Sequence, residues 1–226
     1  VPEILELLEP EVLRYFFALN PRKARDLDLS VLDQLVDDFD RFERAYVGEV
    51  DDEAVTAFAE RAYPYVVTER RDDRIRLPYT FAAVLGMTDD RDLRLEMARN
   101  EGYVDDDTPE WAVEAALERV DCARAWAERM DNAYNYRIQE TLPDVEFDED
   151  TVAALDDLAD FVAAGHDGEA IQGEMYETAR RHGVEVSEFF EAGYLLFFDQ
   201  PQGPRLGEFL GELDSEFVVR RLRREG

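Results

Sequence analysis

The chain has 226 residues, enough for one large domain or two small ones, and 46% of them are hydrophobic, which suffices for a folded core. It carries 55 Asp and Glu against 25 Lys and Arg, a formal charge of −30, and Lys23 is its only lysine. Intrinsic disorder is excluded because 12% of the residues are aromatic. An acidic surface almost without lysine is typical of a cytosol with molar salt, where the Debye length falls to ~3 Å. We therefore expect a halophilic origin, with an ordinary acidic protein as the alternative.

Short sequence features exclude further classes of protein. No apolar run is longer than five residues, against the ~18 that a membrane span needs, and the N-terminus lacks a signal pattern. Cys122 is the single cysteine, so an internal disulfide and a cysteine-based zinc site are excluded. We expect a cytoplasmic chain without a membrane partner. Because it begins at Val1-Pro2-Glu3 without Met, we also expect a part of a longer protein.

Apolar residues recur at helical spacing through most of the chain. Prolines mark early helix starts, and Ser30 is a candidate N-cap. The alternating Leu27-Asp28-Leu29 allows a short strand, and residues 64–76 are expected to be irregular. In the first part of the chain we expect helices at 2–8, 10–20, 30–48, 55–62, 78–85, 90–100 and 108–130.

An acidic run over residues 143–150 is a candidate boundary between two helical units. Beyond it we expect helices near 149–164, 167–182, 187–198, 203–213 and 214–224. The predicted fold is therefore all-α, with two consecutive helical bundles that form an α-helical cage and a short strand pair near the N-terminus. The expected division is an N-terminal segment, a helical bundle and a C-terminal helical bundle, at residues 1–45, 46–142 and 143–226.

Catalytic motifs are missing from the sequence. It contains neither a GxGxxG nor a GK[ST] phosphate-binding loop. His166 and His182, the only histidines, stand beside glycines at expected helix ends, which favours a capping or dipole role over metal ligation. Carboxylates are too numerous to single out an acid/base pair. We expect no catalytic residue, no metal site and no cofactor on this chain.

Two segments stand out as neutral or positive in this acidic chain. Residues 10–26 carry four cations (Arg14, Arg22, Lys23, Arg25) against two anions, and residues 201–226 carry five cations against five anions. Such segments are where a polyanion could bind. The alternative for the last helix is that its arginines complement the helix dipole. For the loop at 22–25 we favour polyanion contact.

Glycine and aromatic spacing adds two weaker signals. Gly203, Gly207 and Gly211 recur every four residues, which places them on one helical face and indicates close approach of another backbone. We expect a neighbouring helix there, with nucleic acid as the alternative. The segment 132–137 (Asn-Ala-Tyr-Asn-Tyr-Arg) carries groups that can stack on unpaired bases. An ordinary aromatic hinge between the bundles is the favoured alternative.

The two ends of the chain resemble a known family. Val1-Pro2-Glu3-Ile4-Leu5 and the following Glu9-Pro10-Glu11-Val12-Leu13-Arg14-Tyr15-Phe16 resemble the segment after the signature catalytic loop of class I aminoacyl-tRNA synthetases. The tail resembles the C-terminus of archaeal-type class I lysyl-tRNA synthetases, through Gly203-Pro204-Arg205-Leu206-Gly207 and Leu213-Asp214-x-Glu216-Phe217-Val218.

The resemblance implies a C-terminal, tRNA-binding part of a longer ligase. In that family the first segment, here 1–45, contacts the inner side of the tRNA and the helical cage recognises the anticodon. ATP, magnesium and lysine would belong to the N-terminal catalytic domain, the second expected partner, so this chain alone should be inactive. On charge and composition, the residues expected to contact tRNA are Arg22, Lys23, Arg25, Tyr134, Tyr136, Arg137, Arg205, Arg220, Arg221, Arg223 and Arg224.

Two other hypotheses stay open at this point. One is the equivalent region of another class I synthetase. The other is a helical protein-interaction module without an RNA role. A small-molecule enzyme ranks last, because no set of residues converges on a catalytic site.

Overall fold

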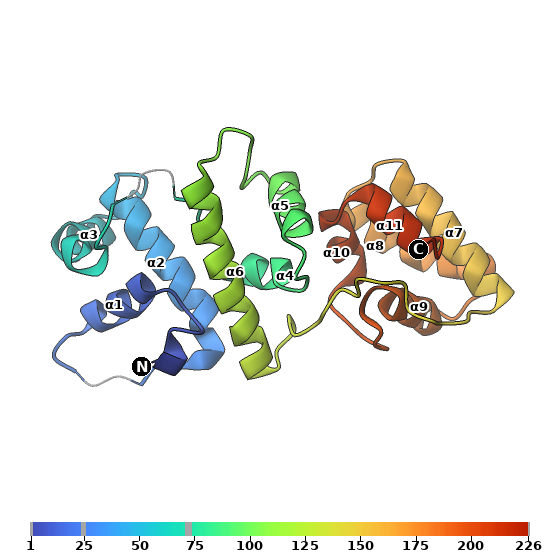
Figure 1. Ribbon diagram of the computed structural model, residues 1–226, viewed down its shortest axis with the longest axis horizontal. Coiled ribbons are helices and arrows are strands. Elements are labelled where there is room, and N and C mark those ends of the chain that lie inside the picture. The colour runs from blue at the N-terminus through green and yellow to red at the C-terminus, as the bar shows by residue number, and fades with distance from the viewer. Residues whose placement is uncertain (1, 24–25, 71–73, 226) are drawn as a thin grey trace. The chain divides into compact units, whose positions relative to one another are not determined.

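The computed structural model describes residues 2–23, 26–70 and 74–225, and every regular element in these ranges is a helix (Figure 1). The all-α prediction is thereby confirmed. The chain forms two compact units, one of Val1–Gly86 with Tyr103–Asn135 and one of Met87–Gly102 with Tyr136–Gly226. The division at 45 and 142 concerned functional segments and stays a prediction.

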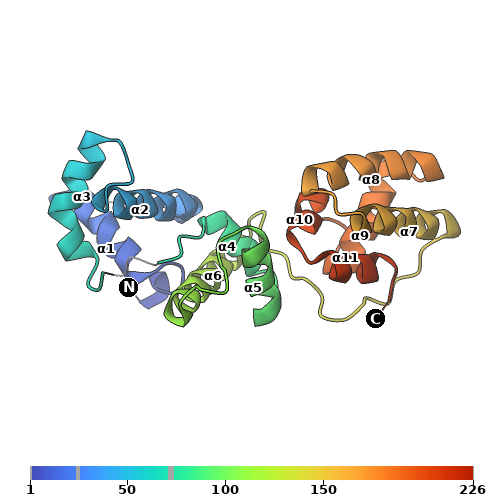
Figure 2. The same ribbon diagram turned by 90° about the horizontal axis from the view of Figure 1, so that it is seen from above.

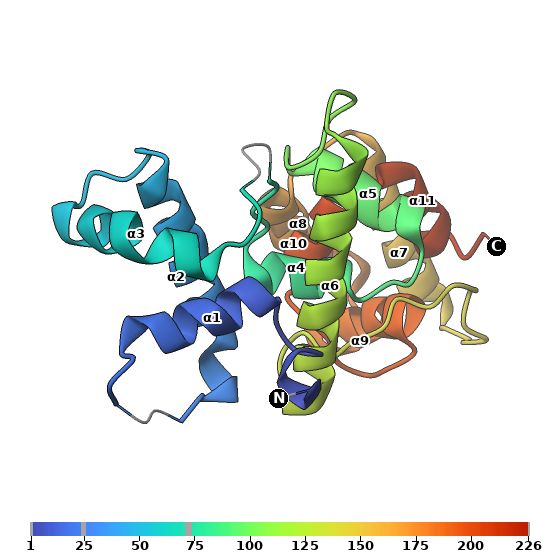
Figure 3. The same cartoon turned by 60° about the vertical axis from the view of Figure 1, so that its left-hand side comes forward.

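The first unit is built around α2 (Leu32–Tyr46) and α6 (Glu110–Met130). The helices α1 (Pro10–Leu19) and α3 (Glu53–Val66) pack against each other and against α2 (Figure 3). The short helix α4 (Tyr79–Leu85) contacts both α2 and α6. These contacts enclose a core that is rich in aromatic rings.

Five aromatic side chains form the centre of the α1–α2–α3 core. The ring of Phe42 lies 5.0 Å from that of Tyr15, 5.4 Å from that of Phe58 and 5.9 Å from that of Tyr63. Phe39 lies 6.2 Å from Phe42, and both are fully buried. Tilted pairs at these distances stabilise by about 0.5–1.5 kcal/mol each beyond their buried area, so the three helices are firmly joined.

The strand pair near the N-terminus is absent from the described ranges. After Asp28 the chain forms a 3-10 turn, η2 (Leu29–Val31), because the Asp28 carboxylate accepts hydrogen bonds from the Ser30 amide at 2.9 Å and the Ser30 hydroxyl at 2.7 Å. A second turn of this kind is η1 (Pro2–Ile4), at the expected short helix. Local side-chain capping thus overrides the alternating pattern.

The irregular segment begins later than predicted, because α3 continues through Pro64 to Val66. A proline removes its own hydrogen bond to the preceding turn. Tyr63 and Val66 are nonetheless buried, at 6% and 1% exposure, and the Tyr63 carbonyl accepts a hydrogen bond from the Val67 amide at 2.9 Å. Packing of these two side chains therefore holds the last turn in place.

Within the described residues the second unit contains six helices, which are α5 (Arg91–Asn100), α7 (Glu149–Ala163), α8 (Gly168–His182), α9 (Val186–Phe198), α10 (Leu206–Glu212) and α11 (Ser215–Leu222). Helix α8 lies beside α7 and α10, and α11 packs on α7 (Figure 2). Aspartate carboxylates cap the N-termini of several helices in both units, each worth about 1 kcal/mol, so part of the acidic composition serves the fold.

The close backbone approach predicted from the glycine spacing is a contact between α8 and α10. A Cβ atom on Gly207 would lie 2.3 Å from the Cα of Gln172, and one on Gly211 would lie 2.6 Å from the Cα of Gly168. Gly203 was expected on the same helical face, but α10 begins only at Leu206 and Gly203 precedes it in the connecting loop. Two of the three glycines therefore carry the helix contact.

Candidate nucleic-acid interface

The arginines after α11 are held by carboxylates of α7. Arg223 lies 2.6 Å from Asp160, and Arg224 lies 2.6 Å from Asp156. Solvent-exposed pairs of this kind contribute little to stability, about 0–1 kcal/mol. Both arginines thus lie at the surface, already engaged by their own chain.

Two further predicted contacts are also paired on the surface. Arg205 pairs with Glu208 one turn further along α10, and its side chain is 61% exposed. Arg137 pairs with Asp89 at 2.7 Å, with 41% of its side chain exposed. These exposed guanidinium groups can exchange a carboxylate for a phosphate at small free-energy cost.

Arg220 differs from its neighbours. It is exposed and has no ion-pair partner in the part of the chain that the structure describes. It lines a hollow of about 270 Å³ together with Glu140 and Glu225, so its surroundings are mixed in charge. A phosphate at Arg220 would therefore meet attraction from one cation and repulsion from two nearby carboxylates.

Arg221, one of the expected RNA contacts, makes its contacts within the fold. Its side chain is buried, and its guanidinium donates to the backbone carbonyls of Gln139 at 2.7 Å, Thr141 at 2.8 Å and Leu196 at 3.3 Å. Burial lowers its pKa from the ordinary arginine value. The side chain joins α11 to α9 and to residues 139–141, and its donors are used within the fold.

The tyrosines of the 132–137 segment pack on helices of different units. The ring of Tyr134 lies 6.2 Å from that of Trp126 in the first unit. The ring of Tyr136 lies 5.6 Å from that of Phe198 in the second. Each tyrosine therefore packs within its own unit, and a stacking role of the segment stays a prediction.

Two consecutive cations without an ion-pair partner among the described residues follow the end of α1. Arg22 and Lys23 are exposed, lie in the turn after α1 and have no ion-pair partner there, whereas the amide of Lys23 donates to the Asn20 carbonyl at 3.2 Å. Phe17, on the last turn of α1, is 63% exposed. Arg25, the third expected contact in this loop, lies outside the described residues. Exposed cations and exposed aromatic rings are the groups that contact phosphates and bases, respectively.

A buried ionic cluster organises the first unit and was not predicted. Arg119 of α6 is only 1% exposed. Its guanidinium donates to Asp40 of α2 through two bonds, at 2.6 and 2.8 Å, to Glu9 at 2.6 Å and to the carbonyl of Leu77 at 2.8 Å. Burial disfavours its charge, but Glu9 and Asp40 raise the pKa of Arg119 above the ordinary arginine value. One side chain thus joins α6, α2 and the segments before α1 and α4.

Two more arginines complete this cluster. Arg74 lies 3.4 Å from Glu9 and 3.7 Å from Glu43, and Arg76 lies 3.5 Å from Glu43. Burial opposes ionisation of Glu9, yet Arg119 and Arg74 hold its pKa below the ordinary value. Burial raises the pKa of Glu43, although Arg74 and Arg76 oppose this. With Asp40, the cluster contains three carboxylates and three guanidinium groups.

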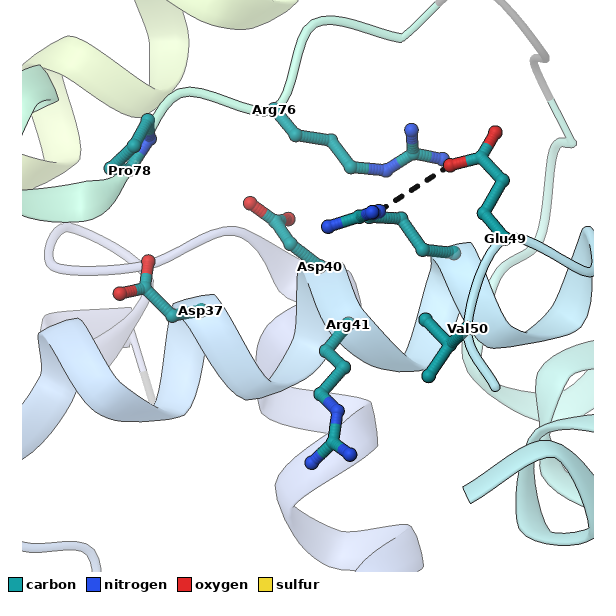
Figure 4. A pocket seen from close by; sticks show the side chains of 8 residues that line it. Asp37, Asp40, Arg41, Glu49, Val50, Arg76 and Pro78 are labelled. Carbon is teal, nitrogen blue, oxygen red and sulfur yellow. Dashed lines mark hydrogen bonds and ion pairs between the residues drawn. The ribbon is translucent and has the colours of Figure 1, made fainter. Parts of the chain in front are cut away.

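A hollow of about 470 Å³ opens beside the cluster. Figure 4 shows Asp37 and Asp40 projecting from α2 towards it, and Arg76 reaching over it from the segment before α4. Arg44 pairs with Glu49 at 3.4 Å, and Arg41 pairs with Asp52. Three arginines and three carboxylates line the hollow, so its formal charge is balanced. The lining residues are Asp37, Asp40, Arg41, Arg44, Glu49, Val50, Arg76 and Pro78.

Metal and membrane sites find no support in the described ranges. No cluster of His, Cys, Asp and Glu side chains there is arranged to hold a metal ion. The Nε2 atom of His182, in the last turn of α8, lies 3.1 Å from a carboxylate oxygen of Asp157 in α7. The ring of His166 stacks on that of Phe161, with 3.8 Å between the ring centroids. Within 2–23, 26–70 and 74–225, no helix is both long enough and apolar enough to cross a membrane.

Comparison with known proteins defines the class. A family model described as tRNA synthetases class I (K) matches residues 1–68. This stretch contains α1, the cationic turn after it and most of the aromatic core of the first unit. The chain is thus related to the class I tRNA synthetases through the segment that carries Arg22 and Lys23.

Within this class the chain is homologous to lysine–tRNA ligases of halophilic archaea. It is 58% identical to the Haloarcula marismortui enzyme over 99% of its own length, and 59% identical to the Natronomonas pharaonis enzyme over 100%. The Pyrococcus horikoshii enzyme is 30% identical over 99% of this chain. The chain spans 42–44% of the length of these relatives. The halophilic origin inferred from composition fits the first two relatives.

Proposed function

We propose that this chain is the C-terminal, tRNA-binding part of a lysyl-tRNA synthetase. The end of α1 contacts the inner side of the tRNA, and the second unit recognises the anticodon loop. ATP-dependent ligation of lysine belongs to the catalytic part of the enzyme, and the proposal assigns no ATP or magnesium site to this chain. The names of the relatives, lysine–tRNA ligases, support tRNA as the partner.

The observation that carries the proposal is the pair of free cations at the end of α1. In a chain of charge −30, Lys23 is the only lysine, and neither it nor Arg22 has a carboxylate partner among the described residues. The two cations follow the C-terminus of α1, where the helix dipole stabilises a positive charge by only about 0.3–1 kcal/mol, so they are still available to a polyanion. In molar salt the repulsion between RNA and the acidic surface is screened within ~3 Å, so these short-range contacts decide binding.

Replacing both cations tests this contact. We expect the double variant Arg22→Gln, Lys23→Gln to bind a lysine tRNA transcript about tenfold more weakly for each charged hydrogen bond lost. Fluorescence anisotropy in molar KCl measures the affinity. The slope of log affinity against log salt should become shallower by about 1 for each lost phosphate contact.

A matched control removes two other exposed arginines of the first unit. Arg61 and Arg129 are exposed and have no ion-pair partner within the described ranges. The double variant Arg61→Gln, Arg129→Gln also removes two positive charges, so its net charge equals that of the test variant. It should bind the transcript as the unchanged chain does. Equal weakening by both double variants would show a general charge effect and remove the end of α1 from the proposal.

A further inference from the structure

Aromatic side chains gather on one surface of the second unit, where α8 meets α9. Tyr176 of α8 is 40% exposed, and its ring lies 5.0 Å from that of Phe190 of α9, tilted by 46°. Tyr194 lies one turn further along α9. Burial raises the pKa of Tyr194, and the neighbouring Tyr136 and Tyr176 raise it further. These four residues, Tyr136, Tyr176, Phe190 and Tyr194, form what we name the aromatic face.

Gly173 lies on α8 one turn before Tyr176, and packing within the chain does not explain it. It is exposed, and a Cβ atom added there would meet nothing within 4 Å, whereas one on Gly207 would lie 2.3 Å from Gln172. Glycine is among the poorest helix formers. Helical side chains lean towards the N-terminus, so the ring of Tyr176 lies over the turn that contains Gly173. The missing side chain leaves the surface beside this ring flat.

A cation lies in the loop that contacts the aromatic face. The Tyr194 hydroxyl donates to the carbonyl of Pro204 at 2.9 Å. The preceding Gly203 is so close to this ring that a Cβ atom there would lie 2.7 Å from it. The next residue after Pro204 is Arg205, whose side chain is 61% exposed. The backbone of the loop before α10 thus lies against Tyr194, and the exposed guanidinium of Arg205 in this loop pairs with Glu208 of α10.

We infer that the aromatic face binds an unpaired RNA base, which stacks on Tyr176 above Gly173 while Arg205 contacts an adjacent phosphate. Every base has a flat π-face, so stacking on aromatic side chains tolerates sequence. Stacking also depends less on salt than phosphate contacts do, which suits a chain of charge −30 in molar salt. The inference rests on the proposed function and assigns the anticodon-loop contact to this face.

A fluorescent base in the anticodon loop tests stacking directly. The probe is a lysine tRNA transcript with 2-aminopurine at one anticodon-loop position, titrated with the full chain in molar KCl. Stacking should quench the 2-aminopurine fluorescence on binding. Tyr176→Ala should abolish the quenching and weaken binding by about 5- to 150-fold, since base–aromatic stacking contributes about 1–3 kcal/mol.

The glycine variant separates a binding role from a structural one. Gly173→Ala should leave the melting temperature unchanged or raise it by about 2–4 °C, while weakening binding and quenching because its methyl group lifts the base from the ring. Tyr65→Ala is the matched aromatic control, because Tyr65 of α3 is 82% exposed in the first unit. It should bind as the unchanged chain does.

The outcomes distinguish this inference from the proposed function. If the unchanged chain binds the transcript while Tyr176→Ala binds equally well with equal quenching, the stacking role of the face is wrong and tRNA binding stands. If the unchanged, folded chain binds no transcript, the proposed function fails and the inference fails with it. A dimer at assay concentration that Tyr176→Ala dissociates would show a second copy of the chain as the occupant and overturn the inference.

Discussion

Arg119→Met lowers the free energy of unfolding of the first unit by about 3–5 kcal/mol, the range found when one partner of a buried ion pair is removed. The variant leaves Glu9, 7% exposed, and Asp40, 8% exposed, as buried carboxylates without their main cation. It also removes the donor to the Leu77 carbonyl. Urea unfolding followed by tryptophan fluorescence measures the effect, because Trp111 and Trp126 both lie in the first unit.

The pH dependence identifies the cause of the loss. In the unchanged chain the pKa of Glu9 is lowered, so its contribution to stability is present above its unfolded value and is lost as the pH falls through its folded value. Without Arg119, burial raises the pKa of Glu9, and protonation then relieves an unpaired charge. The difference between variant and unchanged chain should therefore shrink from pH 7 towards pH 4.

Arg129→Met provides the surface control for this prediction. Arg129 lies in the last turn of the same helix and is exposed. The same substitution there should change the free energy of unfolding by no more than about 0.5 kcal/mol. A loss for Arg119→Met that equals the loss for Arg129→Met, or that does not change with pH, would show that the cluster contributes no specific stability.

Gly207→Ala lowers the free energy of unfolding of the second unit by on the order of 3 kcal/mol, from overpacking and from a disturbed buried hydrogen bond. The added Cβ would lie 2.3 Å from the Cα, 2.4 Å from the backbone N and 2.6 Å from the Cβ of Gln172. The Gly207 amide also donates to the Gln172 side-chain oxygen at 2.7 Å. Because backbone atoms on both sides meet, α8 and α10 must separate.

Two measurements assign this loss to the second unit. In Gly207→Ala the helix content measured by circular dichroism should begin to fall at a lower urea concentration than in the unchanged chain. The midpoint of the tryptophan transition, which reports on the first unit, should shift less. Gly173→Ala makes the same substitution on α8 where nothing lies within 4 Å, and it should stabilise by about 0.5–1 kcal/mol. If Gly207→Ala were as stable as Gly173→Ala, the close packing of α8 on α10 would be wrong.

Helix positions were predictable because their signals are local. Aspartates at 52, 90, 148, 167 and 214 accept hydrogen bonds from the first helical amides. Gly48 and Gly183 follow α2 and α8 with φ of 83° and 70°, a region that favours glycine. The strand predicted at 27–29 does not form, because the Asp28 carboxylate caps the 3-10 turn that follows it and this local cap overrides the alternating pattern.

The ionic cluster could not be predicted, because it depends on contacts between residues far apart in the sequence. The same holds for which arginines are buried and which are exposed. Arg119 lies among Ala116, Val120 and Ala123 on the apolar face of α6. A charged residue on an apolar helix face was the sequence signal that could have indicated a buried ion pair. Arg221 looked like a member of a terminal basic run, but tertiary structure buries it against backbone carbonyls. Arg22, Lys23 and Arg220 combine a sequence signal with exposure and no ion-pair partner among the described residues, and of these Arg220 lies beside Glu140 and Glu225.

Binding of a lysine tRNA transcript, compared with a copy whose anticodon is changed, tests the central claim most directly. Fluorescence anisotropy in molar KCl gives both affinities, and circular dichroism in the same buffer shows that the chain is folded. The account predicts that the chain binds the lysine transcript and binds the altered copy more weakly. Binding to neither transcript by the folded chain would contradict it.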